Sequence, residues 1–253
     1  MEIIYFILFF LTGCVMGGFY TTLGNRLATE NYQFLPYRCD SCHHRLRLIE
    51  SIPILSYLFL KGKCHYCHKK IDIMEPMMEF FTGILFAVSY YSFGFSYDLL
   101  IALGVVSLLI IITVSDLNYL IIPDEVLVFF VLYFIIIQFL SLGIIGVFEH
   151  ILTGVFLFAL MYGIMWLGEK TLKKESLGGG DVKMMFLFGL VLDPLLGTVA
   201  IFLGSIFALP MSLFLLYKNH EKVIPFGPFL LLAFTFLVFT KITPEMLVKV
   251  LGF

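Results

Sequence analysis

Two aspartates in apolar surroundings are the first residues of this sequence that could do chemistry. Asp116 lies within the run LLIIITVSDLNYLIIPDE, and Asp181 follows three glycines in ESLGGGDVKM. Charged side chains are costly inside a membrane, so each of them needs a partner or a function there. Two neighbouring carboxylates cannot easily both ionise, so one keeps its proton while the other acts as a base toward a water molecule. Such a pair predicts aspartyl-protease chemistry.

The glycines before Asp181 suit an extended peptide. A backbone without side chains can lie close to a substrate strand and offer it hydrogen bonds. We therefore expect Gly178, Gly179 and Gly180 to contact a substrate, together with Lys183 at the cytoplasmic edge. The alternative is that Asp181 caps the N-terminus of a helix after a glycine-rich turn. The sequence leaves both roles open.

Other carboxylates have less defined roles. Asp124 follows Pro123 and is interpreted as a residue of the first turn of a helix, although it could instead be the second member of the pair. Glu79 comes four residues after Glu75 and therefore lies on the same helical face. It is either a polar contact inside a helix bundle or part of a second site.

Four of the five cysteines form two tight pairs, Cys39-x2-Cys42 and Cys64-x2-Cys67, separated by 21 residues. Each pair can supply two thiolates from one turn, and four thiolates complete the tetrahedral shell of Zn²⁺. Redox chemistry, disulfides or iron are alternatives, but a reducing cytoplasmic location disfavours disulfides. We predict structural zinc that provides much of the folding free energy of this small loop. Four neighbouring histidines could replace a cysteine but are expected to be solvated: His43, His44, His65 and His68.

The composition shows which class of protein must position these residues. Of the 253 residues, 60% are hydrophobic and 13% are charged, which excludes a water-soluble domain. The net charge of -2 gives no reason to expect a nucleic-acid partner. We predict an all-α polytopic membrane protein in contact with lipid, with eight apolar stretches able to cross a hydrocarbon core of about 30 Å. The stretches lie near 3–23, 77–97, 99–120, 125–142, 150–168, 182–197, 198–217 and 226–240.

The stretches and the basic residues give a domain organisation and an orientation. Most Lys and Arg residues fall in the loops after the first, fifth and seventh stretches, so these loops are expected in the cytoplasm and both termini outside. Four parts are predicted: a transmembrane helix at 1–24, a cytoplasmic zinc-binding loop domain at 25–75, a second transmembrane helix at 76–97 and a six-helix transmembrane peptidase domain at 98–253.

Taken together, DLNYLIIPD at 116–124, GGGDVK at 178–183 and the double CxxC resemble the type IV prepilin peptidase family over essentially the whole chain. The resemblance implies that Asp116 and Asp181 are the catalytic pair. It further implies removal of the basic leader of type IV prepilins and pseudopilins, after a glycine, at the cytoplasmic face of a bacterial membrane. The family often methylates the new N-terminus with S-adenosylmethionine, and Glu79 matches a family Glu in the half of the chain associated with that step.

The sequence departs from the family pattern at two places. The first stretch ends in GGFYT, where the family commonly has Gly-Ser-Phe-Leu-Asn, so Gly18 stands for Ser and Thr21 for Asn. Gly179 stands where family members often have Met. The main competing hypothesis is a transporter or pilus-assembly scaffold, in which a zinc loop docks cytosolic partners and the aspartates carry ions.

Overall fold

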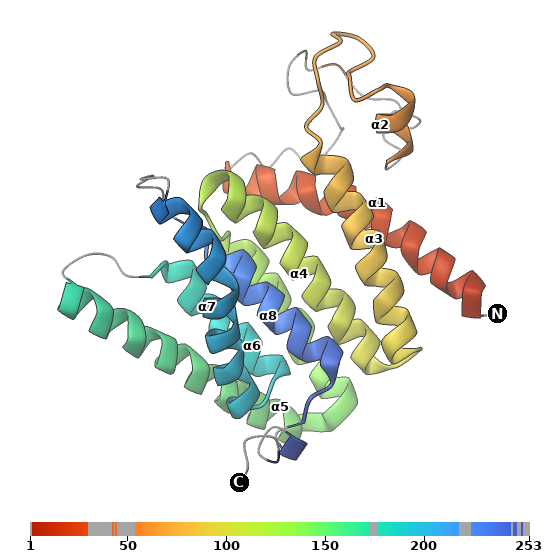
Figure 1. Ribbon diagram of the computed structural model, residues 1–253. Coiled ribbons are helices and arrows are strands. Elements are labelled where there is room, and N and C mark those ends of the chain that lie inside the picture. Colours follow the sequence, from red (N-terminus) through yellow and green to blue (C-terminus); the bar gives the residue numbers. More distant parts are fainter. Residues whose placement is uncertain are drawn as a thin grey trace. The chain divides into compact units, whose positions relative to one another are not determined.

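Helices make up the framework of the computed structural model, which describes residues 2–29, 42, 44, 54–172, 177–217, 224–243, 245, 246 and 249. Eight helices lie within these residues, so the prediction of an all-helical chain is confirmed (Figure 1). They are α1 (Glu2–Ala28), α2 (Leu55–Phe59), α3 (Met74–Phe93), α4 (Tyr97–Tyr119), α5 (Asp124–Leu172), α6 (Gly179–Val191), α7 (Pro194–Tyr217) and α8 (Gly227–Thr240).

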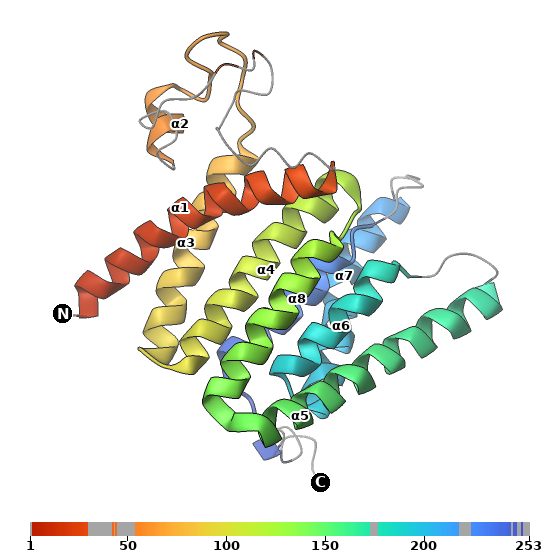
Figure 2. The same cartoon turned by 180° about the vertical axis from the view of Figure 1, so that it is seen from behind.

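Four helical segments of the described chain are long and apolar enough to cross a membrane, namely Glu2–Ala28, Tyr97–Tyr119, Asp124–Thr171 and Pro194–Phe214. The predicted stretches at 125–142 and 150–168 both fall in α5, which bends at Gly143, where φ is 72° and ψ is -170°. Figure 2 shows the two arms of α5 diverging from this bend. The number of crossings, eight from the sequence, stays a prediction.

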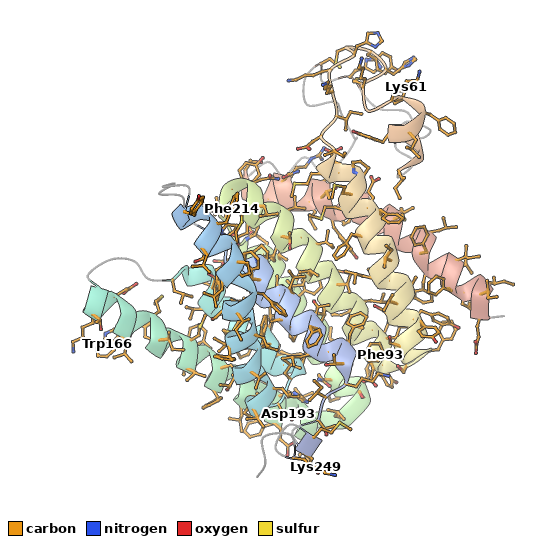
Figure 3. All side chains as sticks on the ribbon, viewed as in Figure 1. Lys61, Phe93, Trp166, Asp193, Phe214 and Lys249 are labelled. Carbon is orange, nitrogen blue, oxygen red and sulfur yellow. The ribbon has the colours of Figure 1, made fainter. Side chains whose placement is uncertain are left out.

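The boundary between α6 and α7 differs from the predicted one. The sequence placed a stretch at 182–197, whereas α6 ends at Val191 and α7 begins at Pro194. Pro disfavours the helical conformation in the residue before it but is well suited to the start of a helix. Asp193 and Phe214 therefore lie near opposite ends of α7 (Figure 3). With 13 residues, α6 is only about 20 Å long.

The chain forms two compact units, Met1–Leu99 and Leu100–Phe253. In the first unit, α1 packs on α3 through small residues. A Cβ atom added at Gly13 would lie 2.8 Å from the Cα of Gly83, so the two backbones nearly touch. Lys61 and Phe93 mark opposite ends of this unit in Figure 3.

In the second unit, α5 and α6 approach as closely as two helices can. A Cβ atom added at Gly189 would overlap the backbone of Gly154, so neither position has room for a side chain. The Nε2 of Gln138 donates a hydrogen bond of 3.0 Å to the carbonyl of Leu190, which satisfies an acceptor at the end of α6. Close backbone approach at small residues is a common way for helices to associate in a membrane.

This crossing generates a stability prediction. Gly189→Ala should lower the free energy of unfolding by about 1–3 kcal/mol, because a methyl group is forced into a filled space. The matched control is Gly163→Ala on α5, where an added Cβ meets no atom of the described residues within 4 Å. Thermal unfolding of the purified protein in detergent measures the effect. Equal midpoints for the two variants would contradict the close crossing.

Candidate active site

Asp116 and Asp181 border one space in the second unit. Asp116 comes from the last turn of α4, and Asp181 is the third residue of α6. A Cβ atom added at Gly227, the first residue of α8, would lie 3.0 Å from Asp116 Oδ2 and 3.5 Å from Asp181 Oδ1. Each aspartate is only 6% exposed. The structure therefore brings both carboxylates, from helices far apart in the sequence, to the start of α8.

Asp181 does not cap its helix. The N-cap is Gly178, whose backbone is extended (φ -68°, ψ 134°), and no side chain caps this end of α6. Asp181 Oδ1 is buried and has no hydrogen-bond partner in the described part of the chain. A buried acceptor without a partner is costly in free energy. This oxygen is therefore available to a water molecule or a substrate.

The three glycines before Asp181 have different surroundings. A Cβ added at Gly178 would lie 3.0 Å from Asp181 Oδ2, and one added at Gly180 would lie 2.8 Å from the Cβ of Ile122. Among the described residues, no atom lies within 4 Å of a Cβ added at Gly179. The outer two glycines are thus restricted by their neighbours, whereas Gly179, at the position that the family often fills with Met, has open space.

The segment between α4 and α5 presents Ile122 to these glycines. Leu120 takes a left-handed conformation (φ 57°), and its N–H donates a hydrogen bond of 2.9 Å to the carbonyl of Asp116. The hydroxyl of Ser115 donates to the carbonyl of Ile121. These two bonds tie the segment to the end of α4, so Ile122 forms an apolar wall beside the aspartates.

Asp124 and Lys183 form an ion pair at the starts of α5 and α6. Lys183 Nζ lies 2.8 Å from Oδ1 and 2.7 Å from Oδ2 of Asp124, and both side chains are more than half exposed. Asp124 belongs to the first turn of α5, as predicted. Its carboxylate faces Lys183, so Asp116 is the aspartate that shares the buried space with Asp181.

The first unit contains a cluster of cysteines that could hold a metal ion. The Sγ atoms of Cys42, Cys64 and Cys67 all lie within 4.8 Å of one another. A tetrahedral Zn²⁺ with Zn–S bonds of about 2.3 Å requires sulfur separations of about 3.8 Å, so small side-chain movements suffice. The fourth predicted ligand, Cys39, lies outside the described residues.

A tight turn holds the second cysteine pair. The N–H of Cys64 donates to the carbonyl of Lys69 at 2.9 Å, and the N–H of His68 donates to the carbonyl of Cys64 at 3.0 Å. Both cysteines of this pair are thereby brought to one side of the turn. Among the histidines that the structure describes, His44, His65 and His68 are exposed and do not belong to the cysteine cluster.

Glu79 lies on α3 and contacts the residue just before α2. Its Oε2 accepts a hydrogen bond of 2.7 Å from the N–H of Ile54. Its Oε1 lies 2.9 Å from the position of a Cβ at Gly18. The residue that replaces the family's Ser is therefore beside this carboxylate, and the missing side chain leaves room for it. Nothing in the sequence indicated that Gly18 and Glu79 would be neighbours.

Comparisons with known proteins show the family of the chain. Residues 11–93 match the bacterial peptidase A24 N-terminal domain, and residues 103–213 match the type IV leader peptidase family. The chain is 33% identical over 190 residues to the prepilin leader peptidase/N-methyltransferase of Bacillus subtilis (strain 168), covering 72% of each chain. The chain belongs to the type IV leader peptidase family. Its members are enzymes, so the predicted family and the predicted enzyme class are confirmed.

Other members of the leader peptidase family give the same result. A prepilin leader peptidase/N-methyltransferase of Myxococcus xanthus (strain DK1622) is 32% identical over 182 residues, which are 71% of this chain and 54% of the relative. One of Aeromonas salmonicida (strain A449) is 26% identical over 211 residues, which are 81% of this chain and 72% of the relative. No solved structure matches this chain. As a member of this family, the chain is a multi-pass membrane protein.

Sequence reasoning missed two residues that border the two aspartates and the glycines before Asp181, namely Ile122 and Gly227. The signal for Gly227 was present in IPFGPF, because Pro and Gly before an apolar run mark the start of a helix. That signal says nothing about which side chain the helix start would meet. Gly227 also lies beyond residues 103–213, the part that matches the family.

Proposed function

We propose that this chain removes the basic leader from type IV prepilins and pseudopilins, by cutting after a glycine at the cytoplasmic face of the bacterial membrane, and then N-methylates the new N-terminus. The observation that carries the peptidase activity is the shared space of Asp116 and Asp181 beside Gly227. Both carboxylates are buried, and one of their oxygens has no hydrogen-bond partner in the described chain.

The two carboxylates would divide the proton transfers of peptide hydrolysis. One takes a proton from a water molecule whose oxygen bonds to the scissile carbonyl carbon, and the other gives its proton to the leaving nitrogen as the C–N bond breaks. The buried surroundings strengthen the electrostatic interactions of both groups with the reacting atoms. No covalent intermediate with the protein is needed.

The glycines would receive the substrate backbone. No described residue fills the space where a side chain of Gly179 would be, so an extended strand would approach there without a clash with them. Gly178 and Gly180 lie on either side of it, next to Asp181 and Ile122. Lys183 comes two residues after Asp181 and pairs with Asp124. Its exposed side chain would contact the substrate.

The peptidase proposal predicts that Asp116→Asn and Asp181→Asn, each alone, lower leader removal by at least about a hundredfold, because each removes an acid–base group. Asp124→Asn is the matched control: it loses an exposed ion pair worth about 1 kcal/mol or less and should keep cleavage. The mass of a co-expressed prepilin reports the result. Normal cleavage in either the Asp116 or the Asp181 variant would exclude the assignment of these two residues as the catalytic pair.

For methyl transfer, Glu79 supplies a negative charge in the first unit that would suit the cationic donor S-adenosylmethionine. Its Oε2 is fixed by the N–H of Ile54, which leaves Oε1 as the accepting atom beside Gly18. The donor, when bound, supplies the methyl group. The carboxylate would hold the donor's charge or the proton that the substrate amine releases.

We predict that Glu79→Gln gives a cleaved but unmethylated pilin. The charge is lost from the first unit, while the aspartates of the second unit are unchanged. Glu75→Gln, one turn earlier on the same helix and exposed, is the control and should be methylated normally. Mass spectrometry of the mature N-terminus with added S-adenosylmethionine distinguishes the two. Full methylation by Glu79→Gln would remove Glu79 from the site.

We further propose that the three clustered cysteines and Cys39 bind one structural Zn²⁺. The CxxC spacing supplies the fourth thiolate, and the turn at Cys64 already has the two backbone bonds that orient its pair. The metal would act on folding of the loop domain and take no part in either reaction.

Purified protein should contain about one Zn per chain, and Cys64→Ser should lose it because one of the clustered ligands is removed. Cys14→Ser is the matched control, since Cys14 is buried in α1 and belongs to no cluster among the described residues. Elemental analysis measures the metal. Stoichiometric iron, or a well-folded protein without metal, would rule out structural zinc.

A further inference from the structure

We propose that Gly227 is a positioning residue of the peptidase site: its N–H orients the Asp116 carboxylate, and its missing side chain keeps open the space between the two aspartates. This inference rests on the proposed peptidase function and adds a residue that lies outside the part matching the family. It gives the start of α8 a positioning role that the hydrolysis steps described above do not include.

The hydrogen bond is the first observation. The N–H of Gly227 donates to Asp116 Oδ2 at 3.2 Å, between buried groups 111 residues apart in the sequence. The first N–H groups of a helix have no acceptor within the helix, so this donor is free to bind a side chain. The terminal torsion of an Asp side chain is broad, so a fixed donor decides where its oxygens point.

The open space is the second observation. A Cβ at Gly227 would lie 3.0 Å from Asp116 Oδ2, 3.3 Å from Ile122 Cδ1 and 3.5 Å from Asp181 Oδ1. The last of these oxygens is buried and has no partner in the described chain. The point that a side chain would fill is therefore the point that both carboxylates face. A water molecule or scissile peptide bond needs that volume.

Packing holds the start of α8 in place. The rings of Phe188 on α6 and Phe234 on α8 stack with centroids 4.2 Å apart and an interplanar angle of 11°. Both side chains are fully buried. The helix that carries Asp181 is thus packed directly on the helix that carries Gly227, which fixes Gly227 relative to Asp181.

The test is Gly227→Ala, with cleavage of a purified prepilin measured as kcat and KM. We expect kcat to fall at least about tenfold, the effect of disturbing one hydrogen bond to a charged group, with KM changed less than about threefold because remote contacts to the substrate remain. Gly163→Ala, whose added Cβ meets no atom within 4 Å in the part of the chain that the structure describes, should keep the kcat of the wild type. A Gly227→Ala variant with the kcat of the wild type would overturn the inference.

A second variant separates positioning from packing. Ile122→Val removes Cδ1, the atom of Ile122 that lies nearest to the added methyl group. If Gly227→Ala acts through Asp116 and Asp181, the double variant keeps the low kcat of Gly227→Ala. Recovery of the kcat of Ile122→Val in the double variant would mean that a clash with Ile122 was the cause, and would overturn the inference.

A backbone ester at position 227 replaces the N–H by an oxygen and adds no side chain. It therefore tests the hydrogen bond to Asp116 even if Gly227→Ala does not fold. Cell-free synthesis with glycolic acid at this position, into lipid nanodiscs, gives the protein. We expect kcat to fall about tenfold to a hundredfold, and an unchanged kcat would overturn the positioning role. Absence of cleavage by the wild-type protein would instead refute the proposed function, and this inference with it.

Discussion

The burial of two carboxylates side by side is the constraint on which the second unit depends. Each carboxylate loses hydration, and each raises the cost of ionising the other, so the site exists only if the surrounding helices fix both. Asp116 is fixed by the N–H of Gly227, and Asp181 is fixed by the turn that begins α6. One oxygen of Asp181 has no hydrogen-bond partner among the described residues, so this arrangement has an acceptor left for a bound molecule.

Glycine provides the close approaches at each functional position. Gly189 and Gly154 let α5 and α6 cross, which sets the position of α6 and therefore of Asp181. Gly180 makes room for Ile122, and Gly18 makes room for the carboxylate of Glu79. The absence of a side chain thus allows helix packing at Gly189 and leaves room beside an ionisable group at Gly18. In the first use the missing Cβ lets two backbones approach, and in the second it leaves room for a neighbouring side chain.

The two units hold different chemistry. The cysteine cluster and Glu79 belong to Met1–Leu99, and the two aspartates belong to Leu100–Phe253. The two family matches divide the chain at nearly the same place, with residues 11–93 and 103–213. A cleaved N-terminus is the substrate of methyl transfer, so one chain can carry out two consecutive steps with separate residues. This separation is what allows the two activities to be tested independently.

The sequence by itself determined the residue types and the local elements. The CxxC spacing pointed to a metal site, the apolar stretches to helices, and the motifs around Asp116 and Asp181 to the family. These follow from neighbours along the chain, which sequence patterns record. The bend at Gly143 and the break before Pro194 were harder to predict, because uniformly apolar residues hide helix ends.

Only the tertiary structure decided which groups meet. It showed that Gly178, and not Asp181, is the N-cap of α6, and that Asp124 pairs with Lys183 while Asp116 faces Asp181. It also brought Gly227 to Asp116 across 111 residues of sequence. The partner of a buried carboxylate depends on which helices pack together and in what rotation, and no local pattern of residues contains that information.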